Sequence, residues 1–171
     1  MDDLTPARRE LLIGGLMSAM MAGLATGAKA SPLNPEQTIV IPKGQIPWAA
    51  HPVYGGNVQE NCTLFGDINK PGPYLTLIRW HPGFMSVPHT YVTDRICMVL
   101  SGVWYVNSGA DYDPKACVQA PAGSFVRRVA NTPHYDGVPT GVAAPAEVAV
   151  FGMGPVMYKA SDPNMTGYAR A

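Results

Sequence analysis

Two histidines, a tyrosine and an arginine are the residues of this chain whose types and spacing could do chemistry. His89 and Tyr91 are two residues apart, Arg95 follows four residues later, and His134 follows a second strand-like run. Residues two apart in a strand face the same way, so His89 and Tyr91 can point into one cavity, which His134 could enter from a neighbouring strand. Neutral imidazole binds zinc, iron, copper or nickel, and a phenol can act as acid, base or further ligand.

Arg95 brings a different chemistry, because its side chain carries only hydrogen-bond donors and stays protonated. A guanidinium inside a cavity repels a metal ion and attracts an anion. The sequence leaves two partners open for Arg95. It could form an ion pair with Asp94, or it could hold a carboxylate-bearing ligand through two guanidinium nitrogens. Cys97, two residues after Arg95, is predicted to face inward as a buried thiol.

The elements that position these side chains are predicted to be short strands separated by glycine and proline turns. The strand-like runs cover residues 37–41, 58–65, 74–80, 95–100, 103–107, 124–130 and 147–152. This spacing is typical of an all-β sandwich or barrel. The pair of runs around Gly102 reads as a tight hairpin, which needs a residue with positive φ.

Length, charge and cysteine content restrict the number of domains and the kinds of molecule that the protein could bind. The chain has 171 residues, which fits one domain, and equal numbers of basic and acidic residues, 12 of each. Without a basic stripe, no nucleic-acid partner is expected. Two of the three cysteines (Cys62, Cys97, Cys117) could pair in an oxidising compartment, but three are too few for a disulfide scaffold.

Residues 1–30 are predicted to be an export signal. Arg8-Arg9 precedes an apolar run over residues 11–26, and Ala28-Lys29-Ala30 forms a small-x-small cleavage site. The paired arginines resemble a twin-arginine signal, with an ordinary secretory signal as the alternative. A membrane anchor is less favoured, because the run is short and rich in Gly, Ala and Ser. We therefore expect a periplasmic or secreted protein with no membrane association after signal removal.

Three further segments are expected after the signal. Residues 31–56 form a proline-rich arm, residues 57–158 the β domain, and residues 159–171 a C-terminal tail. Proline fixes the backbone and removes helix donors, so the arm is predicted to be extended.

The spacing of the chemical residues resembles the first motif of the cupin family. That motif is G, five residues, H-x-H, three or four residues, E, six residues, G. It falls here on Gly83, His89, Tyr91, Arg95 and Gly102. All spacings agree, but Tyr91 stands in place of the second histidine and Arg95 in place of the glutamate. Arginine at that place also resembles a branch of small cupins.

The second cupin motif, G, five residues, P-x-G, two residues, H, three residues, N, has a counterpart as well. It falls on Gly123, Val129, Asn131, His134 and Val138, again with every spacing in agreement. Together the resemblance covers about residues 74–155. It implies a single-domain cupin, a β-sandwich closed into a short barrel (a double-stranded β-helix), with the site inside.

In cupins, the histidines and glutamate of these motifs usually bind one metal ion. The resemblance therefore implies His89 and His134 as ligands, with Tyr91 as a third. The metal would be divalent or ferric: iron, zinc, manganese, copper or nickel. His51 or Asp94 could complete the shell.

The expected function is an exported enzyme acting on a small anionic or aromatic molecule by metal-assisted oxygenation, isomerisation or elimination. Tyr91 and Arg95 are the predicted catalytic residues, and Arg95, Trp104 and Tyr135 the predicted substrate-binding residues. A non-catalytic periplasmic binding or sensing protein is the alternative. A third possibility is a structural cupin whose arm holds a homodimer together, and a homodimer is expected.

Overall fold

The computed structural model describes residues 38–165 and 167–171, so the predicted export signal lies outside the described residues. The chain separates into two compact units, with the boundary between Ile46 and Pro47. The described part of the first unit, residues 38–46, contains one short 3-10 helix, η1 (Lys43–Gln45). The predicted strand over residues 37–41 is not formed at residues 38–41.

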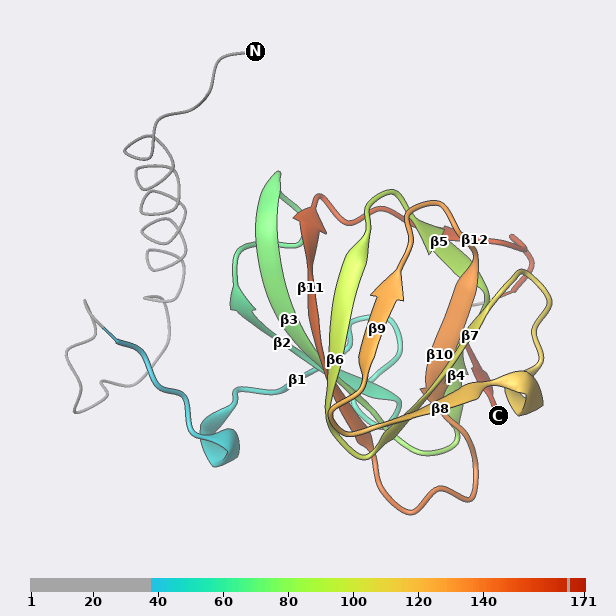
Figure 1. Cartoon of the computed structure of the whole chain (residues 1–171), viewed down its shortest axis with the longest axis horizontal. Coiled ribbons are helices and arrows are strands. Elements are labelled where there is room, and N and C mark those ends of the chain that lie inside the picture. Colours follow the sequence, from blue (N-terminus) through green and yellow to red (C-terminus); the bar gives the residue numbers. More distant parts are fainter. Residues whose placement is uncertain (1–37, 166) are drawn as a thin grey trace, which may run out of the picture. The chain divides into compact units, whose positions relative to one another are not determined.

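The second unit, Pro47–Ala171, contains two antiparallel sheets that face each other (Figure 1). The first sheet has the order β1 (Ala49–Ala50), β2 (Gln59–Phe65), β3 (Gly72–Trp80), β11 (Ala146–Gly154), β6 (Arg95–Ser101) and β9 (Phe125–Arg128). The second has the order β12 (Tyr158–Ala160), β5 (His89–Tyr91), β10 (His134–Val138), β4 (Phe84–Ser86) and β13 (Tyr168–Arg170). On its other side β10 pairs with β7 (Val103–Ser108), which pairs with β8 (Val118–Pro121); a 3-10 turn, η2 (Pro114–Ala116), precedes β8.

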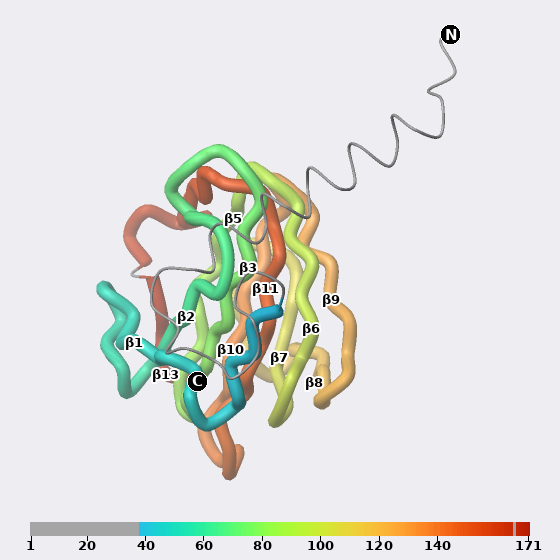
Figure 2. Tube along the Cα trace, turned by 90° about the vertical axis from the view of Figure 1, so that its left-hand side faces the viewer, coloured from blue at the N-terminus to red at the C-terminus, as the bar shows by residue number. Residues whose placement is uncertain are grey.

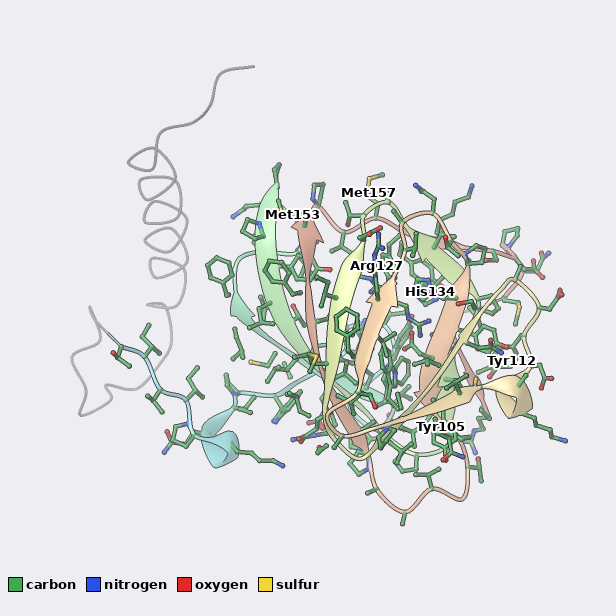
Figure 3. All side chains as sticks on the ribbon, in the orientation of Figure 1. Tyr105, Tyr112, Arg127, His134, Met153 and Met157 are labelled. Carbon is green, nitrogen blue, oxygen red and sulfur yellow. The ribbon has the colours of Figure 1, made fainter. Side chains whose placement is uncertain are left out.

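Alternation along the strands of the first sheet directs one set of side chains inward. In β11 every second residue from Ala146 to Gly152 is buried. Of these, Ala146, Val148 and Val150 meet Trp104 of β7 and Val138 of β10 in one hydrophobic core. In the view of Figure 2, β1 and β2 lie at one edge of this unit and β8 and β9 at the other. Side chains fill the space between the sheets, and His134 is among them (Figure 3).

The all-β prediction is confirmed, and six of the predicted strands match β2, β3, β6, β7, β9 and β11 to within about two residues. Parts of the predicted arm and of the predicted tail belong to the second compact unit. The compact unit begins at Pro47, where the short β1 pairs with β2. The predicted C-terminal tail supplies β13 and most of β12, which pair with β4 and β5.

The three cysteines are free thiols in this structure. Cys97 lies in the core and is 1% exposed, and burial raises the pKa of its thiol to about 11. It is therefore an unreactive packing residue at neutral pH. Among residues 38–165 and 167–171, no helix has the length and apolar character needed to cross a membrane.

Candidate functional site

The rings predicted to share a cavity lie together between the two sheets. His134 opens β10 directly opposite His89, which opens β5. The two imidazole centroids are 4.6 Å apart, and the ring of Tyr91 is 5.0 Å from that of His89. Both histidines are buried, with 4% and 2% of their surfaces exposed. The register of β5 and β10 therefore brings the two motifs to one place.

Backbone carbonyls fix the tautomers of both histidines. His89 Nδ1 lies 2.7 Å from the carbonyl oxygen of Val87, and His134 Nδ1 lies 3.0 Å from that of Thr132. A carbonyl can only accept, so each Nδ1 carries the proton and each Nε2 keeps its lone pair. Burial lowers the pKa of His89 to about 4 and that of His134 to about 3, so both rings are neutral at pH 7.

Arg95 donates a hydrogen bond to the lone pair of one of these histidines. Its Nη2 donates to His134 Nε2 over 2.7 Å, and its guanidinium carbon lies 3.5 Å from the ring centroid of Tyr91. The side chain is 9% exposed, and Nε is buried without a hydrogen-bond partner among the described residues. His89 Nε2 is thus the imidazole nitrogen whose lone pair is left for a ligand.

Of the two partners left open for Arg95, the ion pair with Asp94 is not formed. Asp94 pairs instead with Arg127 on the outer surface, and its Oδ1 accepts from the backbone N–H of Ala130 over 2.7 Å. Asp94 lies in the turn just before β6 with its side chain exposed, whereas Arg95, the first residue of β6, is buried. Within the described ranges 38–165 and 167–171, no carboxylate forms an ion pair with Arg95.

Asp136 is a cavity residue that the sequence analysis missed. It lies two residues after His134 in β10 and is 7% exposed. Arg128 donates to its Oδ2 over 3.1 Å, and its backbone N–H donates to Ser86 Oγ over 3.0 Å. Burial raises the pKa of this carboxyl, but Arg128 and the nearby histidines outweigh it and leave the pKa below its usual range. Asp136 is therefore a buried carboxylate held ionised by a buried cation.

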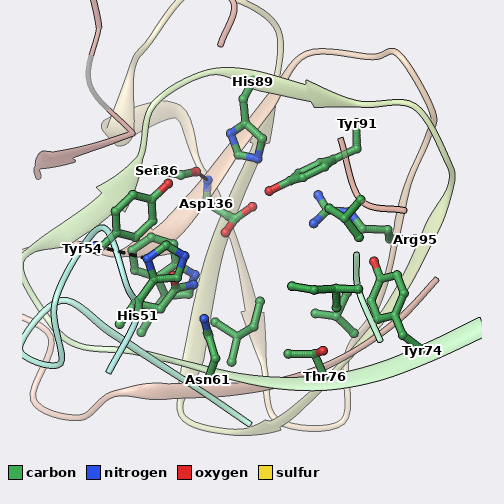
Figure 4. A pocket seen from close by; sticks show the side chains of 16 residues that line it. His51, Tyr54, Asn61, Tyr74, Thr76, Ser86, His89, Tyr91, Arg95 and Asp136 are labelled. Carbon is green, nitrogen blue, oxygen red and sulfur yellow. Dashed lines mark hydrogen bonds between the residues drawn. The ribbon is translucent and has the colours of Figure 1, made fainter. Parts of the chain in front are cut away.

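His89, Tyr91, Arg95 and Asp136 line one cavity of about 140 Å³ (Figure 4), whereas His134 contacts Arg95 but is not among the lining residues. His89 and Tyr91 lie on one wall, and the hydroxyl of Tyr91 points toward the space between His89 and Asp136. Arg95 lies beside Tyr91. Gln59 and Asn61 of β2 also line the cavity. Apolar side chains such as Ile78 and Val150 complete it.

Two predicted substrate-binding residues lie away from this cavity, whose lining does not include them. Trp104 is 3% exposed in the core, where the guanidinium of Arg128 lies 5.1 Å from its ring. The hydroxyl of Tyr135 accepts from Asn107 Nδ2 over 2.8 Å and donates to the carbonyl of Asp113 over 3.0 Å. Both rings contribute packing, as buried aromatic residues commonly do.

The residues present do not fit the implied metal ion. Arg95 donates to the lone pair of His134 and lies against Tyr91, so a fixed cation contacts two of the three predicted ligands. Burial raises the pKa of Tyr91 more than Arg95 lowers it, so the phenol stays protonated. Of the further candidates, Asp94 faces outward, and His51 Nδ1 accepts the backbone N–H of Tyr54 over 3.1 Å.

The same conclusion follows from the donor set as a whole. Within the part of the chain that the structure describes, no three His, Cys, Asp or Glu side chains form a group that could hold a metal. We therefore derive no chemical step through a metal.

Comparisons with known proteins identify the fold. No family model matches the chain, and no curated protein sequence matches it. Among solved structures, the chain is similar to the polyketide cyclase RemF from Streptomyces resistomycificus, at 14% identity and a TM-score of 0.59, over 73% of this chain and 86% of that one.

Two further structures agree. An RmlC-like cupin protein from Ralstonia eutropha JMP134 matches at 19% identity and a TM-score of 0.57, over 78% of this chain and 79% of that one. A Klebsiella pneumoniae protein with a double-stranded β-helix domain matches at 12% identity and a TM-score of 0.51, over 66% of this chain and 90% of that one. The chain has the cupin fold, which confirms the fold expected from its two motifs.

Proposed function

We propose that this protein is an exported enzyme that moves protons on a small organic molecule bearing an anionic group, in an isomerisation or an elimination. The observation that carries the proposal is Arg95, a buried guanidinium with no carboxylate partner among the described residues, beside His89 and Tyr91 in one cavity. A similarly folded protein named as a polyketide cyclase supports chemistry on small molecules in such a barrel.

The anionic ligand follows from the charge balance of the cavity. Arg95 and Arg128 are both buried, whereas Asp136 is the carboxylate beside them, and it is paired with Arg128. A buried charge without a counter-ion is costly. A carboxylate on the ligand would neutralise Arg95 and accept its free N–H, which makes a strong charge-assisted hydrogen bond.

The neighbouring groups can then transfer protons. His89 Nε2 holds a lone pair at neutral pH and would take a proton from a carbon of the ligand. The electrons of that C–H bond move toward an adjacent carbonyl oxygen, which takes the hydroxyl proton of Tyr91; His89 then gives its proton to the neighbouring carbon and Tyr91 takes back the enol proton, which completes an isomerisation. In an elimination the same electrons form a C=C bond and expel a group on the next carbon, which leaves with the proton of Tyr91, and water restores the protonation states of both residues. The raised pKa of Tyr91 keeps this proton in place until it is transferred.

Deuterium exchange tests the proposal even while the product is unidentified. Short carboxylic and keto acids are screened for thermal stabilisation, and each acid that binds is incubated with the enzyme in D₂O and followed by proton NMR. We expect loss of a C–H signal that His89→Ala abolishes. Tyr91→Phe should slow it by about 100-fold, the usual worth of one acid–base group.

The two other outcomes have distinct meanings. Acids that bind with no exchange at any carbon would favour the non-catalytic binding protein. If no anion stabilises the protein, both functions are contradicted.

Export and assembly are part of the proposal. If residues 1–30 are a signal, mass spectrometry of the protein from the periplasm should give an N-terminus near Ser31.

For the expected homodimer, the outer face of β6 is the first surface to test, because Ile96, Met98 and Leu100 are exposed there and Phe125 of β9 pairs with Met98. Sedimentation of Met98→Asp should then give a monomer.

A further inference from the structure

The cavity has a second polar end, formed by two amides of β2. Gln59 and Asn61 are two residues apart and lie opposite Trp80 and Ile78 of β3, which line the same cavity. Gln59 is 5% exposed, and Asn61 Oδ1 is buried without a partner. Among the described residues, neither side-chain amide makes a hydrogen bond. Buried amides are nearly always hydrogen-bonded, so these two indicate groups that a ligand satisfies.

Asp136 adds an acceptor between this end and the arginine. Its Oδ2 accepts from Arg128, whereas its Oδ1 has no hydrogen-bond partner in the described ranges 38–165 and 167–171. Figure 4 shows Arg95 on one side of the cavity and Asn61 on the other, with the carboxylate of Asp136 facing the space between. The cavity is therefore cationic at one end and lined by amides at the other, and a carboxylate oxygen of Asp136 faces the space between them.

This arrangement discriminates between functional groups at the far end of a ligand. A hydroxyl can donate to Asp136 Oδ1 and accept from an amide, so it satisfies both kinds of group. A methyl group would leave the amides and the carboxylate oxygen unpaired. A second carboxylate would be repelled by Asp136.

We propose that the ligand is a small hydroxy monocarboxylate. Its carboxylate lies on Arg95, and its hydroxyl lies between Asp136 and the amides of Gln59 and Asn61. The placement of the carboxylate rests on the proposed function, whereas the recognition of the hydroxyl is independent of it. A cavity of about 140 Å³ is close to the size that encloses one benzene ring, so the acid has about six to ten non-hydrogen atoms.

Titration calorimetry with matched acids tests this inference. The probes are butyrate, 4-hydroxybutyrate and succinate, which differ in the group at one end, and benzoate with 4-hydroxybenzoate as an aromatic pair. We expect the hydroxy acid of at least one pair to bind ten-fold or more tightly than its unsubstituted partner. Succinate should bind more weakly than both butyrate and 4-hydroxybutyrate.

A variant of β2 and a variant of an exposed asparagine outside the cavity provide the internal control. Asn61→Leu should reduce the preference for the hydroxyl to less than three-fold, and a circular dichroism spectrum and melting temperature close to those of the unchanged protein would report that the variant is folded. Asn69→Leu, at an exposed position outside the cavity, should keep the full preference.

Failure of the inference is distinguishable from failure of the proposed function. Equal binding of plain and hydroxy acids, lost in Arg95→Met, would overturn the inference and leave the anion site intact. Preferential binding of succinate would also overturn it. If none of the five acids binds, the inference is overturned, whereas the broader keto-acid screen decides the proposed function.

Discussion

The Arg95 side chain contacts the imidazole of His134 and the phenol ring of Tyr91, and it places a positive charge in the cavity. Its hydrogen bond to His134 and its position over the Tyr91 ring hold the guanidinium in one orientation. Because Arg95 has no carboxylate partner among the described residues, its loss should affect ligand binding more than folding. The cavity end that it occupies should therefore recognise anions only while the arginine is present.

At the residue scale we predict that Arg95→Met weakens the binding of carboxylates by 100-fold or more. A charge-assisted contact to a buried guanidinium is worth about 3 kcal/mol, which corresponds to that factor. Arg127→Met is the matched control, since this neighbouring arginine lies on the exposed face paired with Asp94. Calorimetry with the same acid on both variants measures the difference, and equal losses in the two would contradict a role for Arg95 in the cavity.

Strand parity makes part of this site predictable from the sequence. His89 and Tyr91 share a face because they are two apart, and the same argument applied to His134 would have found Asp136. Applied to β2, it would have found Gln59 and Asn61. The hydrogen bond between Arg95 and His134 could not be predicted, because it depends on how β6 and β10 lie across the barrel.

At the scale of elements, the Gly102 turn sets how β6 continues into β7. Gly102 has a φ of 71°, and a Cβ there would lie 2.3 Å from the carbonyl oxygen of Pro145. The sequence predicts the positive φ from the turn alone. The close approach of Pro145, the residue that precedes β11, comes from the tertiary structure.

Gly102→Ala should therefore destabilise the protein by about 3 kcal/mol or more, from the left-handed conformation together with the steric clash. Gly123→Ala is the control, because Gly123 has a φ of 88° but no atom within 4 Å of the added Cβ. It should cost about 1–2 kcal/mol, the conformational part alone. Urea unfolding of both variants gives the comparison, and equal costs would show that the contact with Pro145 relaxes freely.

The strands that the sequence analysis missed are mostly short. β4, β5, β12 and β13 have three residues each, too few for an alternating pattern to be recognised. They are held by pairing with neighbours far away in the sequence, as β13 is with β4. The long strands β3 and β11 were recognisable because each is a run of mostly apolar residues beside glycine and proline turns, and in β11 burial also alternates over most of the strand.

At the scale of the whole molecule, the two buried histidines make stability depend on pH. Burial lowers the pKa of His89 to about 4 and of His134 to about 3, from a reference value of 6.5 in the unfolded chain. The unfolded chain therefore binds protons more tightly. Stability is fully present above about pH 6.5 and decreases as the pH falls toward 4 and 3.

We expect the metal-free protein to lose on the order of 3 kcal/mol per histidine between pH 7 and pH 4. Urea unfolding at intervals of half a pH unit, with EDTA present, measures the slope. The double variant His89→Gln/His134→Gln should show a flatter dependence between pH 6.5 and pH 5. An unchanged slope in that variant would mean that other groups carry the acid sensitivity.

The contact between Arg95 and His134 also defines how a metalloprotein could be made from this barrel. Arg95→Glu would release His134 Nε2 and set a carboxylate near two imidazoles, and two histidines with one carboxylate form a triad that holds ferrous iron. Calorimetric titration with Zn²⁺ or Fe²⁺ should give stoichiometric uptake by Arg95→Glu and none by Arg95→Gln. The single substitution Arg95→Glu would then change the cavity from a site that binds anions to one that binds a metal cation.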